Sequence, residues 1–458
     1  MRGRRADNGQ MTAPSPPGSE PPTGARSRRR DQILGTAAEL FATRGYTRTS
    51  MRDVAAAAGI LAGSLYHHFD SKEAIAVELV ENYYADLAAA VRGNEAAPGG
   101  GGYVDPLLAL RLFTKQIAGV SFRHQAALQI RLFDAPSAAS PSLRSVVHAA
   151  PGSLGRRWQT LIDAAVADGA ISPQVDPELL RHLLYRVTIQ AGRLAGQLGG
   201  PAPGGAEPVI DCITAIIFDG LATAPAPADD DSDDSDDGGG GKDADAYADS
   251  AAIVVVNEAK ARWEAEAAER LAGRRGAVLA AARDQFALHG FESTTMRDVA
   301  DAAGLTASNL YRYFESKDAL ILEILGDFSD RLLAAYKDVI GAGAAVTETL
   351  DAVLWLLEQA SRQFGPEIEI LQGFGRLVAL GLGEHYEQGA QARLALLAQL
   401  IAAGVASGEF RPVAGAELVA TCVREIMWSP MRDLASVSPL RARTFFRRTV
   451  LSGAAARH

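Results

Sequence analysis

The stretch GYTRTSMRDVAAAAGILAGSLYHHFDSK, residues 45–72, returns as GFESTTMRDVADAAGLTASNLYRYFESK at residues 290–317. The two copies lie 245 residues apart, align without a gap and are identical at 16 of 28 positions. Chance does not hold one register over such a length, so the chain contains a duplicated unit. What this unit does is largely what the protein does.

The first helix of the unit is predicted ahead of the repeated stretch, from Arg28 onward. Ile33, Ala37 and Phe41 recur at helical spacing and form one apolar stripe. Gly45 is typical of a helix that ends in a left-handed residue.

Two more helices follow within the repeated stretch. A variant capping box, Ser50 to Asp53, predicts the start of a second helix, and Gly59 breaks it. A third helix is predicted from Leu61 to Phe69, with Leu65 and Phe69 on its inner face. Three helices with a glycine-marked turn between the second and third form the helix-turn-helix plan.

Length and composition describe a multi-domain globular chain. Its 458 residues exceed one hydrophobic core, and 48% of them are hydrophobic while 22% are charged. Cys212 and Cys422 are the two cysteines, which favours a reduced cytoplasmic setting with ordinary buried thiols. No apolar run reaches the roughly 18 residues that a membrane span needs, and no secretory signal is evident.

The net charge of −10 is confined to one segment. Residues 229–249 hold ten Asp and one Lys, whereas the first 30 residues hold seven Arg against two acidic residues. An acidic total therefore does not exclude a nucleic-acid partner.

The pattern along the chain predicts an all-α protein made of two fused protomers. Helical segments are predicted near 105–134, 137–150, 153–168, 177–198 and 206–222. The sequence GAISP at 169–173 is echoed by GEFRP at 408–412, so the duplication extends beyond the heads. We expect these domains: a disordered arm 1–27, a first head 28–74, a first helical domain 75–223, an acidic linker 224–250, a helical lead-in 251–272, a second head 273–319 and a second helical domain 320–458.

Each head resembles the DNA-binding domain of TetR-type bacterial transcriptional regulators. The shared pattern includes Ala-Gly in the turn, Leu-Tyr-x-x-Phe in the third helix and Ser-Lys after it. The resemblance implies a helix-turn-helix head on a helical domain that dimerises and binds a ligand. Two copies in one chain look like the single-chain double repressors of actinobacteria that control lipid or steroid genes.

The residues common to both heads predict contacts with the DNA backbone. Ser50 and Thr295 cap a helix whose amides can face a phosphate, and Arg52 and Arg297 lie on its outer face. The resemblance implies that the hydroxyls of Tyr66 and Tyr311 bind phosphates. Lys72 and Lys317 are expected to add an ion pair to the backbone.

The residues that differ between the heads predict what each head reads. The outer faces of the third helices hold Ala62, Gly63, Ser64, His67 and His68 in the first copy, and Ala307, Ser308, Asn309, Arg312 and Tyr313 in the second. Asn309 suits adenine and Arg312 suits guanine or phosphate. The two heads should therefore prefer different bases, and a cap at Thr306 is lost at Leu61.

One molecule is expected to act as a pseudo-dimer on an operator that is not a palindrome. Helices 153–168 and 177–198 should pack against 389–407 and 414–428 within the chain, and further oligomerisation is compatible with this arrangement. In the double-stranded DNA complex the protein would be nucleoid-associated.

The resemblance implies a small effector, for which an apolar or acyl compound is preferred. Its candidate contacts are the aromatic residues of the two helical domains: Tyr84, Phe113, Phe122, Phe133, Phe328, Trp355, Phe364 and Phe374.

Catalysis, a cofactor and a metal are not expected, because neither a nucleotide-binding fingerprint nor a metal-ligand spacing occurs. The alternative from another class is a helical interaction protein that kept the fold without specific DNA binding. A salt-titrated DNA-binding assay separates the two, because phosphate contacts give a steep salt dependence.

Overall fold

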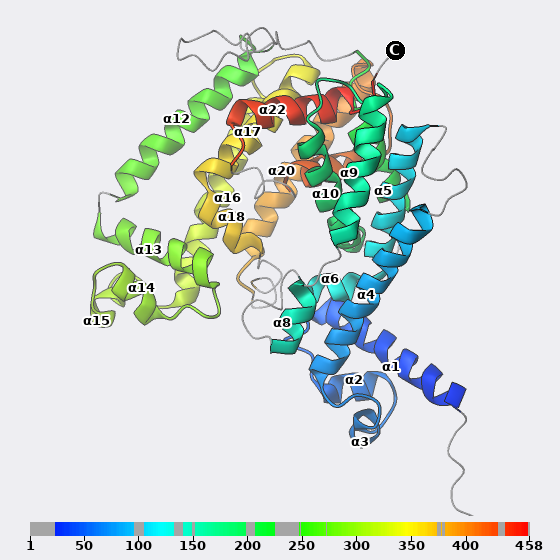
Figure 1. Cartoon of the computed structure of the whole chain (residues 1–458). Helices are drawn as coiled ribbons and strands as arrows, with labels where there is room; N and C mark the ends of the chain where they lie inside the picture. The colour runs from blue at the N-terminus through cyan, green and yellow to red at the C-terminus, as the bar shows by residue number, and fades with distance from the viewer. Residues whose placement is uncertain are drawn as a thin grey trace, which may run out of the picture.

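The computed structural model describes residues 23–95, 105–131, 141–148, 152–197, 207–224, 247, 249–271, 273–372, 377, 381–428 and 436–456. Helices joined by turns make up these residues, and no β-strand is found among them beyond two isolated bridges. The all-α fold is therefore confirmed. Figure 1 shows two small heads that project from a common helical body.

The first head consists of α1 (Thr23–Arg44), α2 (Met51–Ala57) and α3 (Ala62–Tyr66). Its core is the predicted apolar stripe, because Ile33, Ala37 and Phe41 are fully buried together with Leu65. The first helix begins before the predicted Arg28, so residues 23–27 are helical rather than part of a disordered arm. Residues 1–22 lie outside the described residues.

The second head repeats this arrangement with α13 (Arg274–His289), α14 (Met296–Ala302) and α15 (Ala307–Leu310). Gly290 ends α13 at φ 82°, as Gly45 follows α1 at φ 83°. These positive φ angles turn the chain from the first helix toward the second in both heads.

The body of the first half contains the following helices: α4 (Lys72–Glu95), α5 (Pro106–Arg123), α6 (Gln125–Gln129), α8 (Pro141–His148), α9 (Gly152–Ala167), α10 (Pro177–Gln197) and α11 (Glu207–Asp219). α5 is central, with α4, α9, α10 and α11 packed around it. The predicted helix 105–134 is broken at His124, where φ is −113° and ψ 38°.

The body of the second half contains the following elements: α16 (Lys317–Ile340), α17 (Val346–Gln363), α18 (Gly365–Gln372), α20 (Glu384–Ser407), α21 (Ala416–Trp428), α22 (Pro439–Arg447) and the π-helical turn η2 (Arg448–Ser452). α20 packs against α16 and α21. Among the described helices, α20 alone is long and apolar enough to cross a membrane. Core helices meet the same criterion, so length and apolarity do not mark it as a span.

An additional helix, α12 (Ala251–Leu271), leads into the second head. It runs along α16 and α17 and reaches α13, as its path on the left of Figure 1 shows. The described residues of the first half contain no counterpart of this helix. Most of the acidic linker before it lies outside the described residues.

The two halves meet through reciprocal backbone hydrogen bonds. Leu221 N donates to Val450 O at 2.8 Å, and Ala454 N donates to Ile217 O at 2.8 Å. A second matched pair follows, since Ala222 N donates to Leu451 O and Ala455 N donates to Phe218 O, both at 2.9 Å. The same bonds made in both directions describe a local two-fold arrangement, as in the interface of a symmetric dimer.

Two glycines allow the backbones to cross at this junction. Gly220 has φ 71° and Gly453 has φ 83°. A Cβ on Gly220 would lie 2.3 Å from the carbonyl oxygen of Leu451, and one on Gly453 would lie 2.4 Å from that of Phe218. Both positions therefore require glycine for space as well as for conformation.

The predicted interface between the halves is wrong in part. α10 and α21 do lie at the junction, but the most extensive contact there is that of α11 with α21, followed by that of α11 with η2, and helices 153–168 and 389–407 are not among the main partners. α9 packs on α5, and α20 packs on α16, each within its own half. An apolar face shows that a helix is buried and does not show which neighbour buries it.

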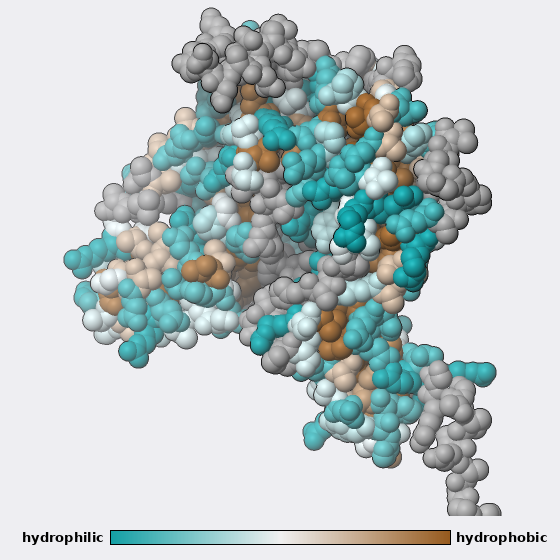
Figure 2. All heavy atoms as spheres, in the orientation of Figure 1, coloured by the Kyte–Doolittle hydropathy of each residue, from teal (hydrophilic) through white to brown (hydrophobic). Residues whose placement is uncertain are grey.

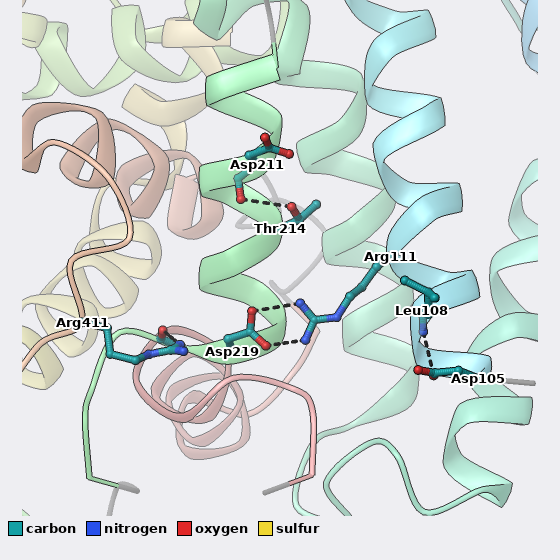
Figure 3. Close-up of polar contacts among 8 residues, drawn as sticks. Asp105, Leu108, Arg111, Asp211, Thr214, Asp219 and Arg411 are labelled. Carbon is teal, nitrogen blue, oxygen red and sulfur yellow. Dashed lines mark hydrogen bonds and ion pairs between the residues drawn. The ribbon is translucent and has the colours of Figure 1, made fainter.

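The last α-helix of each half, α11 or α22, is held to its own half by ion pairs. The acidic and basic partners of these pairs are exchanged between the halves. In Figure 3, Arg111 of α5 reaches Asp219 of α11. In the second half the acid lies on α17 and the bases on α22, since Asp351 pairs with Arg443 at 2.8 Å and with Arg447 at 2.7 Å. This reversal disfavours docking of either last helix on the wrong half, where like charges would meet.

Cys212 and Cys422, which the sequence separates widely, come together at the junction. Both thiols are buried, as expected. Burial and the hydrogen bond with Cys212 raise the pKa of the Cys422 thiol.

Candidate nucleic-acid interface

The second helix of each head begins with a complete capping box. Asp53 N is bonded to the Ser50 hydroxyl, and the Asp53 carboxylate accepts from Ser50 N at 2.8 Å. Thr295 and Asp298 repeat the pattern. These bonds hold the pKa of both carboxyl groups below the usual value. The predicted caps are therefore formed, and a phosphate contact at these helix ends stays a prediction.

Arg52 and Arg297 lie on the outer face of the second helices and are exposed. The Arg297 side chain is 85% exposed and approaches Asp301 at 4.0 Å. Such an exposed pair adds little stability. Both guanidinium groups thus remain accessible to a duplex.

The third helices carry their tyrosines on the surface. Leu65 and Leu310 are fully buried, whereas Tyr66 is 51% exposed and Tyr311 54% exposed. Figure 2 shows hydrophilic residues spread over the visible surface of both heads. About half of each tyrosine is therefore accessible, and a phosphate contact by its hydroxyl stays a prediction.

The residues that differ between the heads lie on these same surfaces. In the first head Gly63, Ser64 and His67 are exposed, while Ala62 and His68 are partly exposed. In the second, all five positions are exposed: Ala307, Ser308, Asn309, Arg312 and Tyr313. All ten predicted reading residues are therefore at least partly exposed, and base readout by them stays a prediction.

The start of the third helix differs between the heads. Thr306 accepts a hydrogen bond from Asn309 N at 3.3 Å through its hydroxyl. Leu61 makes no side-chain cap and is 82% exposed. The predicted loss of the cap in the first head is confirmed.

Lys72 and Lys317 have a structural task that the sequence did not reveal. Lys72 Nζ donates to Tyr46 O at 2.8 Å, and Lys317 Nζ donates to Phe291 O at 2.6 Å. Each ammonium also lies over the aromatic ring of the residue whose carbonyl it binds. Burial lowers the pKa of Lys317. The lysines thus fasten the loop before the second helix, and a phosphate contact by the same groups stays a prediction.

A matched arginine in each head, which sequence reasoning missed, ties the first helix to the body. Arg30 bonds Glu78 of α4 and lies 4.2 Å from the ring centre of Phe69. Arg275 bonds Glu323 of α16 at 2.6 Å and lies 4.5 Å from that of Phe314. The sequence does contain a sign of this contact, because the arginine, the glutamate and the phenylalanine each recur 245 residues apart.

The candidate effector contacts have different surroundings in the two halves, and effector binding by any of them stays a prediction. Phe113 is fully buried against Trp158, and Phe122 is partly buried against the core. Tyr84 donates to Val147 O at 2.8 Å, and Trp355 lies beneath Arg443. Phe133 and Phe374 lie outside the described residues.

Phe328 and Phe364, the remaining candidates, contact each other in the core of the second half, with ring centres 5.1 Å apart. Trp263 of α12 joins them there and was not foreseen, because nothing in the sequence showed where α12 would dock.

Comparison with known proteins places both heads in one family. The family described as bacterial regulatory proteins, tetR family, matches residues 33–79 and 278–324. The HTH-type transcriptional repressor KstR2 of Rhodococcus jostii is 32% identical over 205 residues, 44% of this chain and 95% of that protein. The chain belongs to the TetR family. As a TetR-family protein with two heads, it is a DNA-binding transcriptional regulator.

A second relative agrees with this assignment. KstR2 of Mycolicibacterium smegmatis is 30% identical over 172 residues, 37% of this chain and 84% of that protein. The structure of the ketosteroid transcriptional regulator KstR2 of Mycobacterium tuberculosis has 29% identity and a TM-score of 0.36, covering 38% of this chain and 90% of that chain. Each relative matches less than half of this chain.

Proposed function

We propose that one molecule of this TetR regulator binds one operator through two unlike heads and represses transcription until an effector releases it. The reciprocal junction supports this, because it joins the two halves as two subunits of a symmetric dimer would be joined. In such a complex the heads would enter successive major grooves, about 34–36 Å apart.

The operator of such a molecule would not be a palindrome. Contacts to phosphates would come from residues common to both heads, chiefly Tyr66 and Tyr311 with Arg52 and Arg297. Base readout would come from the residues that differ, with Asn309 and Arg312 offering hydrogen bonds that the Ala62 and Gly63 pair does not. A symmetric DNA sequence would satisfy only one head.

The likeness to KstR2, named a ketosteroid transcriptional regulator, supports a role at genes of steroid or lipid metabolism. A small apolar or acyl effector fits such genes. The proposed organisation of the chain consists of two heads, two helical domains, a linker at 224–250 and a lead-in at 251–272.

Selection of binding sites from a random DNA pool with the full chain tests the proposal. We expect one enriched site without inverted symmetry, bound by a single chain as measured by native mass spectrometry. The affinity should fall steeply with salt, because several phosphates are contacted. An inverted repeat bound by two chains would contradict the pseudo-dimer, and the absence of any enriched site would favour the interaction-protein alternative.

A further inference from the structure

The core of the second half is filled by a residue from outside the duplicated unit. Trp263 of α12 is 1% exposed and its ring centre lies 5.1 Å from that of Phe364. Phe364 contacts Phe328, which in turn stacks on Tyr386 at 6.1 Å. Trp263 thus completes an aromatic cluster built by α16, the end of α17 and α20.

α12 is held firmly in this position. One of its faces is buried at helical spacing, with Ile253, Val256 and Trp263 at 2% exposure or less. Glu266 pairs with Arg331 of α16 at 2.9 Å. A buried apolar stripe and an ion pair to the neighbouring helix both favour the docked position of α12, and so they hold Trp263 in the core.

On the matching surface of the first half, no described helix covers α5 as α12 covers α17. Leu108 and Leu112 on α5 are 50% and 52% exposed, whereas Ala352, at the position on α17 that matches Leu112, is fully buried. The two leucines border a groove of about 500 Å³ between α5, α11 and the second-half residues Val413, Ala414 and Leu418. In the described residues, no helix plays the part of α12 here.

The first half also has a polar cluster around Arg131, whereas the buried Arg393 of the second half donates to the backbone and hydroxyl of Ser329. Arg131 donates to the Tyr185 hydroxyl at 3.0 Å and is also hydrogen-bonded to Tyr84. Tyr83 lies close to Arg131, and burial raises the pKa of Tyr83 to about 12. Tyr83 occupies the place that Phe328 has in the second half, because the two residues lie 245 positions apart.

This arginine lacks an acidic neighbour in the described part of the chain. Its described partners are phenols, which are neutral at ordinary pH, and it forms no described ion pair with a carboxylate. A largely buried cation without a counter-charge is costly. A planar guanidinium with hydroxyl groups beside it suits a carboxylate, which it binds through two parallel hydrogen bonds.

We propose that the effector is an organic acid that binds only in the first half. Arg131 and the Tyr185 hydroxyl bind its carboxylate, and Trp263 has taken the place of an effector in the second half. The apolar part of the acid lies toward the aromatic residues beyond Tyr185, whose ring centre is 6.1 Å from that of Trp158. This inference rests on the proposed ligand response, and it makes that response one-sided.

Calorimetry and thermal unfolding of the full chain test the first-half site. The probes are decanoate, 2-naphthoate and cholate, each paired with its neutral amide. We expect at least one acid to bind at one molecule per chain, and its amide at least tenfold more weakly. Arg131→Gln should weaken that acid at least tenfold, while the control Arg123→Gln, whose side chain is 62% exposed, should leave binding unchanged.

The results that overturn this part are equally definite. No binding of any acid at 1 mM, equal binding of acid and amide, two acids per chain or an unaffected Arg131→Gln variant would each exclude it. The affinity of the wild-type chain for its operator is measured on the same samples without any probe. If the wild-type chain does not bind an operator, the proposed function is contradicted. If it binds its operator and none of the acids binds to it, only this inference is contradicted.

Indole tests the second half, because it has the shape of the side chain that Trp263→Ala removes. Indole should raise the unfolding temperature of Trp263→Ala and leave the wild type and Trp355→Ala unchanged, since a cavity lined by apolar side chains accepts a matching apolar molecule. If Trp263→Ala does not fold, Trp263→Phe with benzene replaces it. Indole binding to the wild type, or no rescue of either variant, would show that Trp263 does not fill a ligand-sized site.

Discussion

Substitution of Gly220 by alanine should destabilise the junction far more than the same change at a matched glycine. Gly220 has φ 71°, which costs an L-residue about 1–2 kcal/mol. Its Cβ would also lie 2.3–2.5 Å from backbone atoms of residues 451–453. Backbone atoms cannot rotate away, so overpacking adds about 1–3 kcal/mol. The total is about 2–5 kcal/mol.

Gly169 provides the control, because its φ is 73° and no atom lies within 4 Å of a Cβ placed on it. Gly169→Ala should therefore cost only the conformational part, about 1–2 kcal/mol. For domains of this size, 1 kcal/mol shifts the unfolding temperature by about 2–4 °C. Gly220→Ala should thus unfold about 2–12 °C below the control in scanning calorimetry.

The reciprocal position adds a second check. Gly453→Ala meets the same obstruction from the other side, so it should cost a similar amount. The double variant should cost less than the sum of the two, because the first substitution already separates the backbones. Equal unfolding temperatures for Gly220→Ala and Gly169→Ala would refute the close crossing.

Three further predictions concern the heads. Tyr66→Phe and Tyr311→Phe should each weaken operator binding about fivefold, which is the equivalent of one hydrogen bond of about 1 kcal/mol. The salt dependence of binding should not change, because no charge is removed. Fluorescence anisotropy titrations at several salt concentrations measure both quantities, and an unchanged affinity would exclude a phosphate contact. Leu61→Thr should supply the missing cap and stabilise α3 by up to about 1 kcal/mol. The backbone amides of α3 should then exchange more slowly with solvent, and an unaltered exchange rate would contradict this prediction. The lowered pKa values of Asp53 and Asp298 mean that both capping boxes stabilise the folded heads above pH about 4 and lose this contribution as pH falls through the lowered pKa. Replacing both carboxylates by asparagine should flatten thermal stability between pH 5 and 2, and an unchanged pH profile would argue against this role.

The heads were predictable from the sequence because their information is local. Capping at Ser50 and Thr295, burial of Leu65 and Leu310 and the absent cap at Leu61 all follow from spacing within a few residues. Such patterns need no knowledge of distant contacts.

The body was less predictable because its contacts join residues far apart. The pattern of α9 and α20 indicates a buried face, and each was assigned to the junction, whereas each packs within its own half. Trp263 and Arg131 gain their meaning only from neighbours brought by folding. The same applies to Lys317, whose ammonium is bound by carbonyls of the preceding loop.

Covalent union of the halves changes how such a regulator can evolve. In a homodimer every mutation of the reading helix appears twice, so both half-sites must change at once. Here the same junction holds two separately encoded heads, which carry Ser64 and Asn309 at matching positions. If one molecule binds one operator, as proposed, a mutation in one reading helix would alter recognition of one half-site only. Promoters could then change one half-site at a time while the other half-site keeps the protein bound.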